Sequence, residues 1–152
     1  MNKLLVLIKK NEEIVSYIFW GFLTTVVSWC SYSALVWLFD SLKLSEMISV
    51  TFSNLFSWIM AIVFAFVTNK IFVFKSRSWK REVLIPETVK FIGARVFTGV
   101  MELVLVPFLV FVGLKQTIFG IQGMLSKVIV TILVIIVNYI FSKNFIFKKA
   151  SK

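Results

Sequence analysis

Residues 91–111, FIGARVFTGVMELVLVPFLVF, form an apolar run that carries two charged side chains, Arg95 and Glu102. An α-helix needs about 20 residues to cross a bilayer, and this run is long enough. A charge inside the hydrocarbon core costs roughly 2.5–3.5 kcal/mol on insertion scales, so such a side chain usually faces protein or water. In a helix the two residues share one face, about 10 Å apart along the axis. The run therefore predicts a membrane helix with a buried polar face.

Three further apolar runs, residues 17–39, 48–68 and 123–141, have similar length. The chain is 59% hydrophobic with a mean hydropathy of +0.94, whereas a soluble domain is nearer half apolar. Because the excess is grouped into runs of membrane length, we predict an all-α membrane protein with four transmembrane helices. Its 152 residues are expected to form a single domain over residues 1–152.

The formal charge is +10, from 17 Lys and Arg against 7 Asp and Glu, and the basic residues flank the apolar runs. A topology with both termini inside places 14 of the 17 at or near the inner side, including those of a predicted loop over residues 75–90. Only Lys43, Lys115 and Lys127 then lie toward the outside, in agreement with the positive-inside rule. The charges set the orientation or also bind anionic lipid, and both interpretations stay open. A nucleic-acid partner is not expected.

Several classes of active site lack their residues in this sequence. There is no His, and the lone Cys30 cannot form a disulfide framework or a cysteine metal site. No paired acids and no Gly-rich phosphate loop occur either. We therefore expect no enzymatic activity, no metal and no cofactor.

The two halves of the chain resemble each other. FWG at residues 19–21 recurs as FIG at 91–93, an offset of 72, and NKIFVFK at 69–75 recurs as SKNFIFK at 142–148, an offset of 73. The matches predict two parallel two-helix repeats, about 19–75 and 91–148, since each half has an even number of spans. Repeated halves with a polar site between them are typical of transporters. The alternative is that Phe, Gly and Lys recur at the ends of membrane helices in any case.

The ordered motifs of all four runs resemble one known family. The first run begins YIFWGFLTTVVSW, and the others supply the following matched residues: Asn69, Lys70, Phe74, Arg95, Glu102, Ser126, Lys127, Asn138, Tyr139, Ser142, Lys143 and Phe147. This set is similar to the GtrA-like family of small four-span membrane proteins. Ser142 departs from the pattern, because it stands where Asn69 stands in the first motif.

The resemblance implies translocation of a polyprenyl-phosphate-linked monosaccharide, typically an undecaprenyl-phosphate sugar, across the bacterial cytoplasmic membrane. The sugar would then be added to O-antigen, teichoic acid or another polymer of the cell envelope. A membrane glycosyltransferase that makes the lipid-linked sugar is the implied partner. Four spans enclose little volume, which favours a homo-oligomer.

Such a substrate needs a cation for its phosphate and polar groups for its sugar. The candidate substrate-binding residues are Arg95, Glu102, Lys127, Asn69, Lys70, Asn138, Ser142 and Lys143. The guanidinium of arginine suits a phosphate, and amides and hydroxyls suit a sugar. For Lys70 and Lys143, which lie at the predicted inner boundary, membrane anchoring is an equal alternative. For Arg95 and Glu102 the alternative is a structural pair.

Depth predicts a second pairing for Glu102. Counting from Phe91 places Glu102 about 16 Å from the inner boundary, and counting from Lys143 places Lys127 about 24 Å from it. The gap of roughly 8 Å can close if the side chains lean together and the helices tilt. Since a buried Glu and a buried Lys each need a partner, we predict that they form an ion pair and leave Arg95 for a phosphate.

Two other functions remain as alternatives. A small proton-coupled drug exporter would use Glu102 as its acid, although the first run has no acid and the basic site repels cations. An accessory subunit of a membrane glycosyltransferase would leave movement of the lipid-linked sugar unchanged when the chain is absent.

Overall fold

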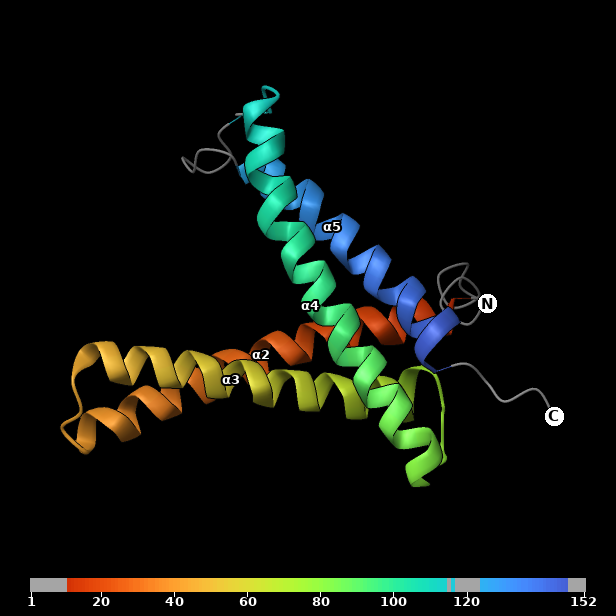
Figure 1. Ribbon diagram of the computed structural model, residues 1–152, viewed down its shortest axis with the longest axis horizontal. Coiled ribbons are helices and arrows are strands. Elements are labelled where there is room, and N and C mark those ends of the chain that lie inside the picture. Colours follow the sequence, from red (N-terminus) through yellow and green to blue (C-terminus); the bar gives the residue numbers. More distant parts are fainter. Residues whose placement is uncertain (1–10, 115, 117–123, 148–152) are drawn as a thin grey trace, which may run out of the picture. The chain divides into compact units, whose positions relative to one another are not determined.

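The computed structural model describes residues 11–114, 116 and 124–147, and this part of the chain holds four α-helices and no strand. The helices are α2 (Glu12–Ser41), α3 (Glu46–Thr68), α4 (Arg81–Phe111) and α5 (Met124–Phe141), shown in Figure 1. The second and the fourth α-helix each continue into a π-helix: η1 (Asn69–Val73) follows α3, and η2 (Ser142–Ile146) follows α5. All four helical segments are long and apolar enough to cross a membrane, so the four-span all-α prediction is confirmed.

Two helices extend beyond the predicted spans. The structure starts α2 at Glu12 rather than at residue 17, and it starts α4 at Arg81 rather than at residue 91. The predicted loop over residues 75–90 is therefore wrong in its second part, because residues 81–90 are helical. The prediction followed the apolar run, whereas a helix continues through the polar headgroup region, and Glu82 in its first turn suits the helix dipole. The start of the fourth predicted span, residue 123, lies outside the described residues.

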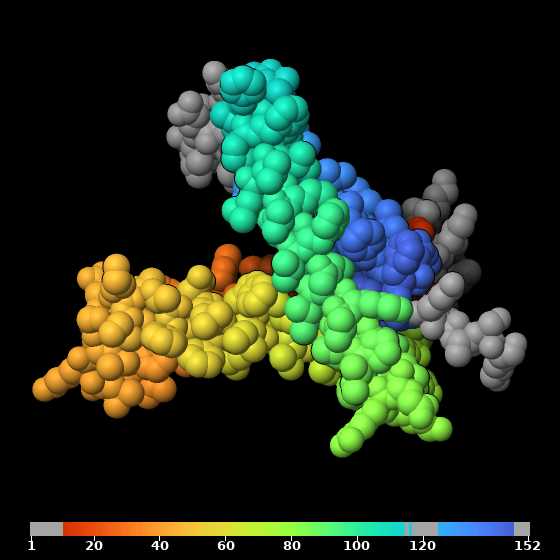
Figure 2. All heavy atoms as spheres, in the orientation of Figure 1, coloured from red at the N-terminus to blue at the C-terminus, as the bar shows by residue number. Residues whose placement is uncertain are grey.

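The chain divides into two compact units, Met1–Arg77 and Ser78–Lys152. In the first unit α2 and α3 lie side by side, and their packed, turn-connected ends appear in orange in Figure 2. Every fourth residue of one stripe of α3 is small and buried: Ser49, Ser53, Ser57, Ala61 and Ala65. Residues four apart share one helix face, and small side chains let two helix backbones approach closely. This stripe therefore explains how the backbones of α2 and α3 come close together, while Trp20 of α2 contacts Phe64 of α3 with ring centroids 6.2 Å apart.

In the second unit α4 and α5 lie side by side along most of α5 (Figure 1). Phe91 of α4 and Val130 of α5 are each only 1% exposed, and both belong to the core of the structure. Most other large apolar side chains of the two helices are exposed, such as Leu103 and Phe111. Exposed apolar side chains of this number are expected where the surroundings are lipid.

The two units end their second helices in the same way. In each, the amide N–H of the phenylalanine that follows the π-helix donates to the carbonyl of the first π-helical residue. Phe74 donates to Asn69 and Phe147 donates to Ser142, both at 2.9 Å. π-Helical turns are rare and are frequent at functional sites, so two at matched places are notable.

The same phenylalanines make matched aromatic contacts. The ring of Phe74 lies 6.4 Å from that of Tyr17 at 55°, and the ring of Phe147 lies 6.1 Å from that of Phe91 at 54°. These contacts relate Tyr17 to Phe91, an offset of 74, rather than Phe19 to Phe91. Both likenesses are what a repeated sequence would produce, and the repeat itself stays a prediction.

The orientation of the chain also stays a prediction, and exposed serines at the two sides allow a test. Ser45 lies between α2 and α3, Ser78 lies before α4, and both are exposed. In a chain with Cys30 replaced by Ser, we expect Ser45→Cys to react with a membrane-impermeant maleimide in intact cells. Ser78→Cys should react only after the membrane is opened, because the basic residues place it inside. The opposite labelling pattern would reverse the topology.

Candidate functional site

One face of α4 carries three polar residues, and two of them contact polar residues of α5. Arg95, Thr98 and Glu102 lie three and four residues apart, so they share a face of the helix. Their counterparts on α5 are Asn138 and Lys127. We call these five residues the polar row. It lies wholly within the second unit, inside helices of membrane-spanning length.

The middle of the polar row is a buried contact between Thr98 and Asn138. Thr98 is 1% exposed and Asn138 is 3% exposed, and Thr98 Oγ1 lies 3.2 Å from Asn138 Oδ1. The same hydroxyl is 3.0 Å from the carbonyl oxygen of Ala94. A hydroxyl has one proton, so these oxygens share it or compete for it. The bond to Asn138 is therefore one of several that this hydroxyl can make.

Sequence reasoning missed Thr98. A threonine inside an apolar run is common in membrane helices, so the residue type alone gave no signal. The available signal was its spacing, three residues after Arg95 and four before Glu102, which places all three on one face.

Farther along the two helices, the ammonium group of Lys127 forms an ion pair with Glu102 Oε1. The predicted pairing of these residues is therefore confirmed. The side chain of Glu102 is 28% exposed and that of Lys127 is 53% exposed, so neither is sealed inside the protein. In an apolar surrounding each charge depends on the other, because the survivor of a broken pair is left uncompensated.

The residue before Lys127 links the start of α5 to the segment that follows α4. Ser126 is 0% exposed, and its hydroxyl donates to the carbonyl oxygen of Leu114 at 2.6 Å. Leu114 lies three residues past the end of α4, and its own amide N–H donates to the carbonyl oxygen of Leu109 in the last turn of that helix. Ser126 thereby fixes the position of Lys127 opposite Glu102.

At the other end of the row, Arg95 lies over an aromatic ring. Its guanidinium carbon is 5.0 Å from the centroid of Phe91, and the side chain is half-buried. No ion pair joins Arg95 to another residue in the described part of the chain. A cation–π contact leaves the N–H donors at the edge of the guanidinium for an anionic ligand.

Two of the predicted residues, Asn69 and Lys70, belong to the first unit. Lys70 is 0% exposed, and its ammonium donates to Ser76 Oγ at 3.1 Å. Asn69 is 3% exposed; its amide donates to the carbonyl oxygen of Ala65 at 2.8 Å. Within the described residues its buried Oδ1 has no hydrogen-bond partner. An unsatisfied buried acceptor usually indicates an absent ligand, water or partner.

The second lysine motif differs from the first. Lys143 is exposed, its ammonium donates to Tyr139 Oη at 3.1 Å, and it lies 5.4 Å from the centroid of that ring. Ser142 is 2% exposed and begins η2. Lys70 and Lys143 therefore have different surroundings, although their sequence motifs correspond. Anchoring at the membrane boundary fits the exposed Lys143 better than the buried Lys70.

Among the residues that the structure describes, no group of three or more His, Cys, Asp or Glu side chains could hold a metal ion. The row instead offers one guanidinium, one ion pair and two neutral polar groups. These are groups that bind a charged headgroup with hydroxyls through hydrogen bonds.

Comparison with known proteins supplies further evidence. The family described as "GtrA/DPMS, transmembrane domain" matches residues 16–147. The chain is 28% identical over 138 residues to an uncharacterized membrane protein, YwcD, of Bacillus subtilis, covering 90% of this chain and 97% of that protein. It is 30% identical over 143 residues to the cell wall teichoic acid glycosylation protein GtcA of Listeria innocua, covering 90% and 86%. No solved structure matches the chain.

Proposed function

The chain belongs to the GtrA/DPMS transmembrane domain family and is a multi-pass protein of the bacterial cytoplasmic membrane, and we propose that it serves teichoic acid glycosylation. Its task there is to move a polyprenyl-phosphate-linked monosaccharide from the inner to the outer leaflet. The relatives named for teichoic acid glycosylation support the process. The polar row supports the translocation step within that process.

The observation that carries the proposal is the position of the polar row across one pair of membrane helices. From Arg95 to Glu102 the row extends seven residues, about 10 Å along α4. An amphiphilic lipid can move its tail through the bilayer without help, whereas its phosphate and sugar need polar partners at depth. The row supplies such partners at successive depths, which is what a path for a headgroup requires.

Each member of the row has a chemical role in this proposal. Arg95 binds the phosphodiester, because its planar donors match two phosphate oxygens. Thr98 and Asn138 bond sugar hydroxyls by giving up the contact that they make with each other. Glu102 and Lys127 keep each other charged at depth and receive the headgroup from the other three residues of the row. No bond of the substrate is broken, so the protein acts as a carrier and not as an enzyme.

The first unit contributes a second set of polar groups. Asn69 has a buried side-chain carbonyl oxygen that can accept a bond from a hydroxyl, and the next residue, Lys70, carries a buried ammonium that donates to Ser76 Oγ. We assign these two residues, with Ser142 and Lys143, to the predicted inner boundary, where the headgroup arrives. A homo-oligomer and a membrane glycosyltransferase remain the expected partners.

The ion pair argues against export of a cationic drug. A proton-coupled exporter needs a carboxylate that is free to bind either a proton or the cationic drug. Here the carboxylate that the row offers, Glu102, already has the ammonium of Lys127 as its partner. An anionic substrate fits the remaining unpaired charge, that of Arg95.

The cellular test is deletion of the gene followed by analysis of the sugars on purified teichoic acid. We expect the sugar modification to be lost or reduced about tenfold or more, and the lipid-linked sugar to accumulate inside. Complementation should restore the sugar modification and return the amount of lipid-linked sugar to the wild-type level. Unchanged glycosylation together with an unchanged lipid-linked pool would contradict the proposal.

A further inference from the structure

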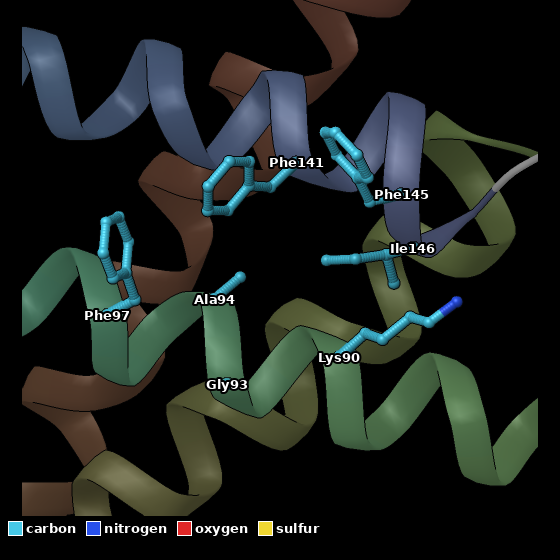
Figure 3. Close-up of a pocket in the computed structure, with 7 residues that line it drawn as sticks. All are labelled: Lys90, Gly93, Ala94, Phe97, Phe141, Phe145 and Ile146. Carbon is cyan, nitrogen blue, oxygen red and sulfur yellow. The ribbon is translucent and has the colours of Figure 1, made fainter.

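A second feature of the second unit is an open groove beside the polar row. The groove has a volume of about 350 Å³ and is lined by Lys90, Gly93, Ala94, Phe97, Phe141, Phe145 and Ile146. Six of the seven residues are apolar, and Lys90 lies at one end, as Figure 3 shows. The volume falls in the usual range for a small-ligand site, about 300–1,000 Å³.

The shape of the groove follows from its residues. Gly93 has no side chain, and a Cβ atom added there would meet no other atom within 4 Å. Phe141 and Phe145 lie across the groove from Gly93, and Phe97 lies one turn along α4 from it; the ring centroids of Phe97 and Phe141, and of Phe141 and Phe145, are each 5.8 Å apart. A hollow between a glycine and a row of rings is suited to a narrow hydrocarbon chain.

The groove and the polar row use different faces of α4. Residues 90, 93, 94 and 97 form a stripe at the helical spacing, and residues 95, 98 and 102 form another, roughly 120° around the axis. Arg95 does not line the groove. Lys90 is exposed, and it has no hydrogen bond or ion pair to any other residue that the structure describes.

We propose that this groove docks the first isoprene units of a polyprenyl phosphate, with the phosphate at Lys90. This inference rests on the proposed function, which names the lipid, and it adds where the lipid binds. The charge at the end of the groove is positive, and that of the phosphate is negative. From Lys90 the groove extends to Phe97, about 10 Å along α4 and deeper into the predicted span.

One groove beside one lysine distinguishes between classes of lipid. A polyprenyl phosphate has a single chain for each phosphate, whereas a diacyl phospholipid has two. A single narrow groove accommodates the first arrangement and leaves one chain of the second unbound. From this docking position the headgroup has about 8 Å to travel along α4 before it reaches Arg95.

The test is photolabelling of the purified chain in detergent. The probe is a polyprenyl monophosphate with a diazirine in the isoprene unit next to the phosphate, and labelled residues are mapped by mass spectrometry. We expect the label within residues 90–97 and 141–146. Unlabelled polyprenyl phosphate should compete, and phosphatidylglycerol at the same concentration should not.

Two variants and two matched controls sharpen the test. Gly93→Leu fills the groove, and it should fold because leucine favours a helix more than glycine does and the site is open. We expect it to lower labelling about tenfold, equivalent to a tenfold weaker affinity. Lys90→Gln should lower it several-fold. Gly99→Leu, also at an open position but outside the groove, and Lys80→Gln should stay within about twofold of wild type.

The docking site would be overturned by labelling outside the groove, by equal competition from phosphatidylglycerol, or by unchanged labelling of Gly93→Leu. A dimer that Gly93→Leu dissociates would also overturn it, because a second copy would then cover the groove. The labelling needs no transport, so its outcome is separate from that of the proposed function. Groove labelling without translocation by wild type would reject the carrier function alone, and normal translocation by Gly93→Leu would reject the docking site alone.

Discussion

Replacing Arg95 with lysine should lower teichoic acid glycosylation about tenfold or more while the protein still inserts and accumulates. Lysine keeps the positive charge but loses the planar pair of donors, and one bidentate contact is worth at least the ~1.4 kcal/mol that a tenfold change requires. It also loses part of the stacking on Phe91, which lies 5.0 Å from the guanidinium. The measurement is the sugar content of purified teichoic acid in a complemented deletion strain.

Arg81→Lys is the matched control for this substitution. Arg81 is the first residue of α4 and is exposed, so the same chemical change there should leave glycosylation within about twofold of wild type. Full activity of Arg95→Lys would show that any cation suffices at this depth. Arg95 would then be an anchoring residue, and the phosphate would have to be assigned elsewhere.

The second large effect concerns the ion pair between Glu102 and Lys127. Glu102→Gln and Lys127→Met should each destabilise the protein in detergent by about 2–3 kcal/mol, because each leaves one charge uncompensated in an apolar surrounding. The double variant should recover at least about 1 kcal/mol of the summed loss, a coupling typical of residues in direct contact. Thermal unfolding of the four proteins gives this double-mutant cycle.

A surface pair provides the control cycle. Lys75 and Glu12 form an ion pair at 3.5 Å with side chains 56% and 71% exposed. An exposed pair contributes little, so Lys75→Met and Glu12→Gln should show a coupling below about 0.5 kcal/mol. Strictly additive losses at Glu102 and Lys127 would mean that the two side chains have no coupling energy. Glu102 would then be better assigned as a protonatable or sugar-binding group.

The sequence predicted the four spans and the deep ion pair, because both depend on simple physical quantities. A membrane span is read from the length of an apolar run, and the Glu102–Lys127 pair follows from the rise of about 1.5 Å per helical residue and the cost of a lone charge. The start of α4 at Arg81 was not predictable in this way. Residues 81–90 carry four charged side chains and so fall outside the apolar run, and hydropathy does not show whether such a segment is helical.

The candidate site was predicted in part. Arg95, Glu102, Lys127 and Asn138 stand out because each is costly within a membrane, and in the structure Glu102, Lys127 and Asn138 take part in contacts between α4 and α5. Thr98 was missed because its polarity is small. The groove at Gly93 was also missed, because it depends on which side chains face each other across two helices. The different surroundings of Lys70 and Lys143 likewise come from packing and not from their shared motif.

Translocation in reconstituted vesicles tests the carrier function most directly. The purified chain is placed in liposomes with a labelled polyprenyl-phosphate monosaccharide, and arrival of the sugar at the opposite leaflet is followed by its access to an added membrane-impermeant reagent. We expect wild type and Arg81→Lys to accelerate this arrival at least about tenfold over empty liposomes, and Arg95→Lys to remain close to the empty rate. Wild-type vesicles no faster than empty ones, from protein that still restores glycosylation in cells, would contradict the carrier function and favour an accessory subunit of the glycosyltransferase.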